Sequence, residues 1–241
     1  MMKIIEKFKA KTLDKQNNPP VNIAFLGDNV TQGCFEVYLN EGNDVETVFD
    51  KSSAYHNYIA RIFTTLYPEV PVNIINAGIS GDNAPHGFER IERDVICHKP
   101  DLVVVCFGLN DCNRGVDGLD NYTAALGNIF EAISKSGAAV IFLTPNMMNT
   151  SISPHINNEL IRNVAKSTLE NQLNGILDMY IDAARAVCDK YNVPVCDCYA
   201  KWKRMSDCGV NVTELLANKI NHPTRDMNWL FAYSLVEKIF E

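Results

Sequence analysis

Five short apolar segments, separated by segments of helical length, constrain the fold of this 241-residue chain more than any other feature. The third segment, residues 101–108, is apolar throughout its interior, as is typical of a parallel strand that is covered on both faces. The intervening segments repeat apolar residues at helical spacing. This alternation predicts a parallel sheet with right-handed crossovers. The five predicted strands are residues 21–27, 70–78, 101–108, 138–145 and 193–198.

Helices are predicted between these strands and after the last one. They cover residues 55–66, about 85–97, 122–133 and about 160–191, followed by a C-terminal amphipathic helix that carries Trp229 and Phe240. The fourth helix is expected to be interrupted near Asn174 and Gly175. We expect a three-layer α/β/α sandwich with a flavodoxin-like, five-stranded parallel sheet in the order 2-1-3-4-5. Residues 1–20 are expected to form a lead-in, and residues 21–241 a single domain.

Three segments show no sustained period and are predicted to be loops. They are residues 35–53, residues 146–157 and residues 207–223. Long loops in compact domains often carry function, so the first two are expected to lie near a binding crevice and to set substrate specificity.

Charge and composition exclude several classes of partner. The net charge of −7 disfavours nucleic acid and anionic membrane surfaces, which are bound mainly through Lys and Arg. No window approaches the roughly 18 consecutive apolar residues of a membrane span. The N-terminal residues interleave lysines with apolar residues, unlike a signal peptide, so we expect a cytoplasmic protein. We expect the eight cysteines to be reduced thiols. Cys196 and Cys198, with Cys188 and Cys208 nearby, lack zinc-module spacing, so no metal is predicted.

Polar residues follow several of the predicted strands. Asp28 and Asn29 follow the first strand, Gly81 follows the second, Asn110 follows the third, and His222 precedes the last helix. The carboxyl ends of parallel strands meet at one edge of a sheet, where α/β proteins bind their ligands. These residues therefore point to one site at that edge. Residues 27–33 lack the endings of nucleotide-binding loops, so no cofactor is predicted.

The order of these residues resembles that of the SGNH (GDSL-type) hydrolases, a family of esterases on a flavodoxin-like fold. Gly27-Asp28-Asn29-Val30-Thr31-Gln32-Gly33 matches the family pattern Gly-Asp-Ser-x-Thr-x-Gly except at the serine. Gly108-Leu109-Asn110-Asp111 matches Gly-x-Asn-Asp. Lys219-Ile220-Asn221-His222-Pro223 retains the His-Pro of the pattern Asp-x-x-His-Pro and lacks its aspartate.

The resemblance implies an ester hydrolase with a Ser-His type mechanism. Asn29 occupies the nucleophile position, and His222 is the general base. The backbone N–H groups of residues 29 and 81 and the amide of Asn110 would form the oxyanion hole. Asp28 and Asp111 would support the loops. The substrate would be a small ester, such as an acetylated carbohydrate, and the sequence leaves open whether the chain is a homo-oligomer.

The resemblance leaves the group that orients His222 open. In family members without the aspartate, backbone oxygens are thought to hold the histidine. In this chain, the candidates for orienting His222 are backbone oxygens, Glu214 and Asp226. Asn29 is expected to keep a hydrogen bond to His222.

Asn29 cannot act as serine does, because a carboxamide is a poor nucleophile. Three explanations stay open: the residue is an introduced replacement of serine, the natural protein binds an ester or sugar without cleaving it, or His222 activates water directly. The first and third describe an ester hydrolase that is impaired in this chain. The second describes a binding protein on the same scaffold.

Other conspicuous residues have structural interpretations. Asp28 is expected to brace its turn, and Thr31 to be structural rather than a replacement hydroxyl. Trp229 is expected in the core, whereas Trp202 is left open as a platform for a sugar ring. The remaining histidines are expected to be surface or packing residues; they are His56, His86, His98 and His155.

Overall fold

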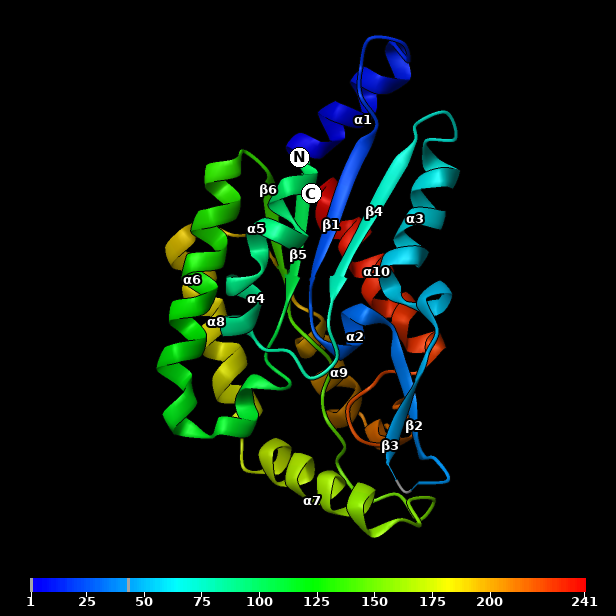
Figure 1. Cartoon of the computed structure of the whole chain (residues 1–241), viewed down its shortest axis with the longest axis vertical. Coiled ribbons are helices and arrows are strands. Elements are labelled where there is room, and N and C mark those ends of the chain that lie inside the picture. The colour runs from blue at the N-terminus through cyan, green and yellow to red at the C-terminus, as the bar shows by residue number, and fades with distance from the viewer. Residues whose placement is uncertain (1, 43) are drawn as a thin grey trace.

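A five-stranded parallel sheet forms the centre of the computed structural model, which describes residues 2–42 and 44–241 (Figure 1). Its strand order is β4-β1-β5-β6-β7, which confirms the predicted 2-1-3-4-5 order of the five sequence segments. The strands are β1 (Val21–Gly27), β4 (Val72–Gly78), β5 (Leu102–Cys106), β6 (Ala139–Leu143) and β7 (Val195–Cys196).

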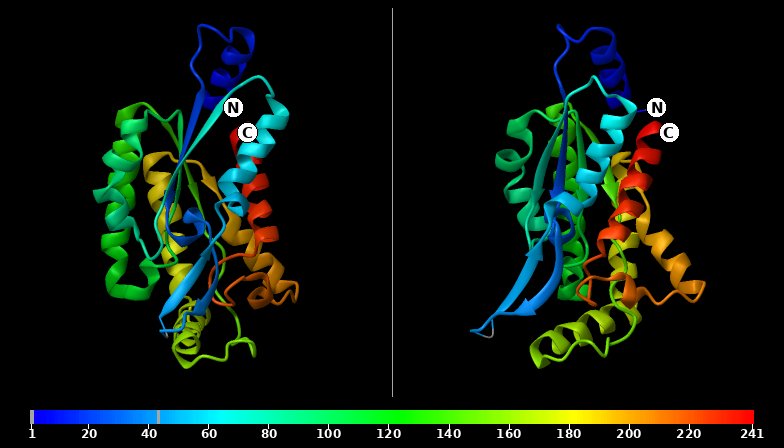
Figure 2. Two further views of the ribbon diagram at one scale, coloured as in Figure 1. Left: turned by 45° about the vertical axis from the view of Figure 1, so that its right-hand side comes forward. Right: turned by 90° about the vertical axis from the view of Figure 1, so that its right-hand side faces the viewer.

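Helices cover both faces of this sheet and make the predicted three layers (Figure 2). One layer contains α1 (Lys3–Leu13), α3 (Tyr55–Leu66) and α10 (Arg225–Phe240). The other contains α4 (Ala84–Glu89), α5 (Ile91–Asp94), α6 (Leu119–Ser136) and α8 (Ile176–Tyr191). Short 3-10 helices lie at η1 (Lys51–Ser53), η2 (Ile96–His98), η3 (Asp111–Arg114), η4 (Val116–Gly118) and η5 (Val212–Leu215).

The main hydrophobic core lies on both sides of the central strands. Every residue of β5 is buried, in agreement with its unbroken apolar sequence. The α1 helix within the lead-in also contributes to this core, because Ile4, Ile5 and Phe8 are buried in it. Among the described residues, no helix is both long and apolar enough to cross a bilayer.

The prediction that residues 35–53 form a loop is wrong. This segment contains an antiparallel hairpin, β2 (Cys34–Leu39) and β3 (Val45–Phe49), followed by η1. Phe35, Val37 and Leu39 alternate with Glu36 and Tyr38 in β2, whereas β3 shows no such alternation. The Asn40 side chain accepts hydrogen bonds from the backbone of Gly42 and Asp44 in the turn. This period-two signal covers only five residues, which is too short to predict the hairpin.

Two predicted helices are divided. Residues 85–97 form α4, α5 and η2, because the chain leaves helical geometry at Arg90, whose guanidinium turns inward to Asp82. Residues 160–191 form α7 (Glu159–Leu173) and α8, and Gly175 lies between them with φ of 74°. The predicted interruption is therefore confirmed.

The C-terminal region also differs in detail from the prediction. The fifth strand is only two residues long, because Cys198 begins α9 (Cys198–Asp207). The predicted loop 207–223 contains η5. The chain then enters α10, with the side chain of Thr224 capping its first turn.

The carboxyl edge of the sheet is flanked by two projecting elements. In Figure 1, α7 and the β2–β3 hairpin both extend beyond the ends of β1, β4 and β5. The hairpin and α7 therefore border this edge of the sheet.

Candidate functional site

The first wall of the site is the turn that follows β1. Asp28 caps the short helix α2 (Asn29–Gln32), and its Oδ1 accepts the N–H of Val30 at 3.1 Å. The backbone of α2 packs directly against the end of β4, where a Cβ on Gly78 would come within 2.2 Å of the Gln32 nitrogen. A glycine at 78 is therefore required for Asn29 to reach the sheet edge. The role of Thr31 is structural: it is buried, and its hydroxyl bonds that of Tyr55 at 2.9 Å.

The side chain of Asn29 points toward the loops that follow β4 and β5. Its Oδ1 accepts the backbone N–H of Gly81 and the Nδ2 of Asn110, each at 2.9 Å. Its Nδ2 donates to the Ser80 hydroxyl at 2.8 Å. Gly81 has φ of +79°, a conformation that favours glycine. Two donors from different strand exits thus converge on one oxygen atom.

Asp111 and Asp82 hold these two exit loops together. The buried carboxylate of Asp111 accepts the N–H groups of Gly108 and Ala84, both at 2.9 Å. The second Nδ2 hydrogen bond of Asn110 goes to the carbonyl of Asp82 at 2.8 Å. The Asn110 amide is therefore fixed in direction before any ligand arrives.

His222 lies on the last loop before α10 and is buried. Asn218 shapes this loop, because its Oδ1 accepts the backbone N–H groups of residues 220, 221 and 222. The Nδ1 of His222 lies 2.8 Å from the carbonyl oxygen of Phe35, at the start of the hairpin. Of the alternatives left open by the sequence, a backbone oxygen is the one found against the ring.

The two acidic residues that the sequence left open as partners of His222 have other surroundings. Glu214 pairs with Lys219 at 2.8 Å, and Asp226 is exposed on the first turn of α10. The expected hydrogen bond between Asn29 and His222 is also wrong, because both polar atoms of the Asn29 amide are directed to residues 80, 81 and 110.

Burial controls the protonation of the site. Burial lowers the pKa of His222 to about 4, although the Phe35 carbonyl and the charge of Glu36 oppose it. The imidazole is therefore neutral at physiological pH. Burial raises the pKa of Asp28 to about 7 and that of Asp111 to about 6, against the hydrogen bonds that both carboxyls accept from the backbone.

The raised pKa of Asp28 predicts a specific dependence of stability on pH. The folded pKa of Asp28, about 7, lies above the ordinary value of 3.8. The stability that the protonated carboxyl contributes to the fold is therefore complete below pH 3.8 and is lost as the pH rises to about 7. The Asp28→Asn variant removes this titration. We expect its unfolding free energy, relative to the parent, to increase between pH 4.5 and 6.5 by up to about 1.4 kcal/mol per pH unit. Urea unfolding at several pH values measures the difference, and a pH-independent difference would contradict the assignment.

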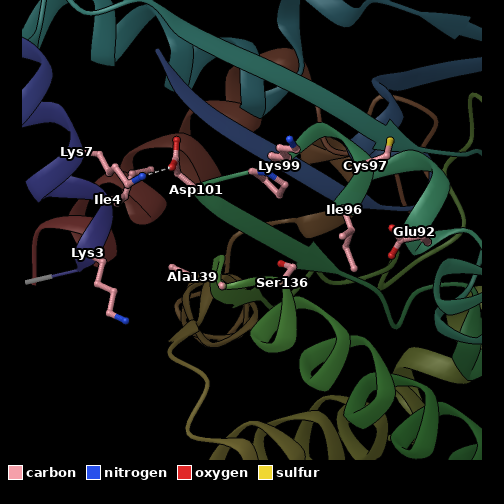
Figure 3. A pocket seen from close by; sticks show the side chains of 12 residues that line it. Lys3, Ile4, Lys7, Glu92, Ile96, Cys97, Lys99, Asp101, Ser136 and Ala139 are labelled. Carbon is pink, nitrogen blue, oxygen red and sulfur yellow. Dashed lines mark ion pairs between the residues drawn. The ribbon is translucent and has the colours of Figure 1, made fainter. Parts of the chain in front are cut away.

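A cavity of about 530 Å³ opens beside these residues. Asn29, Asn110 and His222 line it together with parts of the hairpin and α7. A second cavity, of about 560 Å³, lies at the opposite edge of the sheet (Figure 3). Its lining includes Lys3, Lys7 and Asp101, with Lys7 and Asp101 paired at 3.0 Å, and none of the predicted site residues. The predicted residues thus gather at only one of these two cavities.

Sequence reasoning missed three contributors to this edge. Ser80 receives a hydrogen bond from Asn29, Phe35 supplies only its backbone carbonyl, and Arg90 is buried beneath the exit loops. A backbone carbonyl leaves no trace in the residue type. Arg90 carries no distinguishing signal either, because it is one of five charged residues between Glu89 and Asp94.

The question that the sequence left open for Trp202 is answered against a sugar platform. Its side chain extends from α9 and is fully buried in the core. Trp229 packs against the core and stacks on Tyr58 with ring centroids 4.0 Å apart. His56 is buried, whereas His86, His98 and His155 are exposed.

Residues 25–230 match the model of the GDSL-like lipase/acylhydrolase family. The chain is 31% identical over 132 residues to an acetylxylan esterase of Geobacillus stearothermophilus, covering 51% of this chain and 58% of that protein. It is 32% identical over 98 residues to an arylesterase of Vibrio mimicus, covering 38% of this chain and 48% of that protein. The matches thus span only about half the length of these curated relatives.

Solved structures share the fold. The acetylxylan esterase Axe2 from Geobacillus stearothermophilus superposes with a TM-score of 0.66 at 20% identity, covering 91% of this chain and 94% of Axe2. A two-domain esterase (CEX) active on acetylated mannans gives a TM-score of 0.66 at 18% identity, covering 98% of this chain and 52% of that protein.

Proposed function

Because this chain belongs to the GDSL-like lipase/acylhydrolase family, we propose that its carboxyl-edge site is built to hydrolyse small carboxylic esters and is impaired in this chain by Asn29. One observation carries the proposal. The Gly81 N–H and the Asn110 amide converge on a single oxygen atom at 2.9 Å each. This is the arrangement that stabilises the oxyanion of ester cleavage.

In a Ser-His mechanism, His222 would supply the general base. When Nδ1–H donates to the Phe35 carbonyl, Nε2 is left free to accept a proton. With a hydroxyl at position 29, Nε2 would take its proton as the oxygen attacks the ester carbonyl. The imidazolium would then protonate the departing alcohol. Water would release the acid from the acyl intermediate by the same route. The backbone N–H of residue 29 is the third proposed oxyanion donor.

Asn29 impairs this sequence in two ways. Its carboxamide has no nucleophilic hydroxyl for His222 to activate. Its Oδ1 also accepts the two hydrogen bonds that an oxyanion would need, so the side chain competes with the substrate for Gly81 and Asn110.

The substrate proposal rests on relatives. The names of the similar proteins refer to acetylated xylan and to acetylated mannans. We therefore put acetyl esters of carbohydrates forward as candidate substrates.

A second candidate is a binding protein for an ester or a sugar on the same scaffold. It is favoured by the retention of the 530 Å³ cavity beside a residue that cannot attack an ester. Under this alternative, the unmodified chain binds its ligand, and Asn29→Ser leaves that affinity unchanged and yields no turnover.

Covalent trapping tests the proposed hydrolase site. We expect the Asn29→Ser variant to react with a fluorophosphonate and to gain one adduct at position 29, because His222 activates the introduced hydroxyl. Peptide mass spectrometry locates the adduct. The unmodified chain and the Asn29→Ser/His222→Ala variant serve as controls and should stay unlabelled. Labelling that is independent of His222, or its absence in folded Asn29→Ser, would refute the assignment of the base.

A further inference from the structure

The cavity at the site has an aliphatic wall that the proposed chemistry does not use. It continues away from Asn29 and His222 between the β2–β3 hairpin and α7. The wall is made of Val37, Val45, Leu160, Ile161, Val164 and Ile220. Leu160 is 57% exposed, and Val45 and Val164 are each 53% exposed. These side chains leave a strip of apolar surface open to solvent directly beside the candidate site.

Some polar groups of this cavity are already hydrogen-bonded, whereas the hydroxyls of Thr47 and Ser167 are available to a ligand. Asn218 donates to the Asn221 Oδ1 at 3.0 Å, and its own Oδ1 accepts hydrogen bonds from three backbone N–H groups. Asn113 accepts from Asn171 at 3.0 Å, and Thr168 bonds Asn149 at 2.6 Å. Among the described residues that line the cavity, none is Asp, Glu, Lys or Arg, and none is Phe, Tyr or Trp.

A saccharide fits the aliphatic wall poorly. Each sugar hydroxyl that leaves water needs a new hydrogen-bond partner, and burying it without one is costly. The six aliphatic side chains of the wall offer no such partner, and the described lining holds no Phe, Tyr or Trp on which a sugar ring could stack. A hydrocarbon chain needs no hydrogen bonds and gains from covering aliphatic side chains.

We propose that the groove between the β2–β3 hairpin and α7 binds the linear aliphatic chain of an ester whose carbonyl lies at Asn29, Gly81 and Asn110. The inference rests on the proposed function and changes its substrate class, from acetylated sugars to esters with an alkyl chain. The chain can belong to the acyl or to the alcohol part, because both meet at the carbonyl.

The first experiment measures chain-length preference in the Asn29→Ser variant. Its substrates are the 4-nitrophenyl esters of acetate, butyrate and hexanoate, together with hexyl acetate and ethyl acetate. We expect kcat/KM to rise about twofold or more for each added methylene, since full burial of a methylene corresponds to about fourfold. A gain along the 4-nitrophenyl series places the chain on the acyl side, and a gain of hexyl over ethyl acetate places it on the alcohol side.

A charge placed on the wall provides the specific test. Val164→Asp should lower the ratio of hexanoate to acetate kcat/KM by about tenfold, because the chain would then lie against a carboxylate. Asn163→Asp is the matched control, since it adds the same charge at the adjacent exposed position of α7, outside the cavity lining. The control should leave both rates unchanged.

Binding to the unmodified chain separates this inference from the proposed function. Saturation-transfer NMR with hexyl acetate and ethyl hexanoate should detect contact that Val164→Asp weakens and Asn163→Asp retains. If Asn29→Ser is inactive while this pattern holds, the hydrolase assignment fails and the groove assignment stands. A flat chain-length profile in an active variant, a ratio that Val164→Asp does not change, or the absence of alkyl ester binding overturns the groove assignment.

Discussion

Asn29→Ser is expected to raise ester hydrolysis by at least about 10³-fold over the unmodified chain. Loss of the nucleophile in serine hydrolases removes about 10⁶-fold of kcat, and only binding and the oxyanion donors remain. Here even those donors are engaged by the Asn29 Oδ1. Serine is shorter than asparagine, so the substitution supplies a hydroxyl and also frees Gly81 and Asn110. Initial rates with 4-nitrophenyl acetate measure the gain.

Asn29→Ala is the matched control for this gain. It frees the same donors without supplying a nucleophile, so it isolates the contribution of the hydroxyl. We expect it to remain within about tenfold of the unmodified chain. If folded Asn29→Ser were no faster than Asn29→Ala, the site would not be a hydrolase missing its serine.

Arg90→Met is expected to destabilise the fold by about 3–5 kcal/mol. Arg90 is 7% exposed, and its Nε and Nη2 each lie 2.7 Å from the buried carboxylate of Asp82. It also donates to the carbonyls of Ala77 at 2.7 Å and Gly27 at 3.1 Å, at the ends of β4 and β1. The substitution would leave Asp82 charged, buried and without its main partner. Equilibrium urea unfolding measures the loss.

Arg93 offers the control for Arg90. It lies three residues later, its side chain is 75% exposed, and it pairs with Asp94. Arg93→Met should leave the free energy of unfolding nearly unchanged, because surface ion pairs contribute little. Equal losses in the two variants would show that Arg90 has no special role beneath the exit loops.

The position of the site could be predicted because strand topology determines it. An unbroken apolar strand 102–106 requires cover on both faces, and parallel strands place their exits at one edge. Asn29, Gly81 and Asn110 follow three such exits, and they meet through hydrogen bonds of 2.9 Å. Their proximity was a consequence of topology and needed no knowledge of side-chain conformation.

The remaining details depend on tertiary contacts that residue types do not encode. The group at the His222 ring is the backbone carbonyl of Phe35, from a segment that was predicted to be a loop. The direction of the Asn29 amide depends on two donors and one acceptor in two other loops, and none of them is His222. Trp202 lies in the core because α9 packs inward, and a helix of that length was not predicted.

The β2–β3 hairpin contacts both the His222 ring and the aliphatic groove. Its Phe35 carbonyl holds His222, and its Val37 and Val45 form one side of the groove. Arg225 anchors the base of the hairpin through Glu36 at 2.6 Å and Asp50 at 2.9 Å, with its guanidinium over the Phe35 ring. A ligand that displaces the hairpin would also shift the carbonyl oxygen that lies against the His222 ring. Under the two proposals, occupancy of the groove and the basicity of the imidazole would therefore be coupled through this pair of strands.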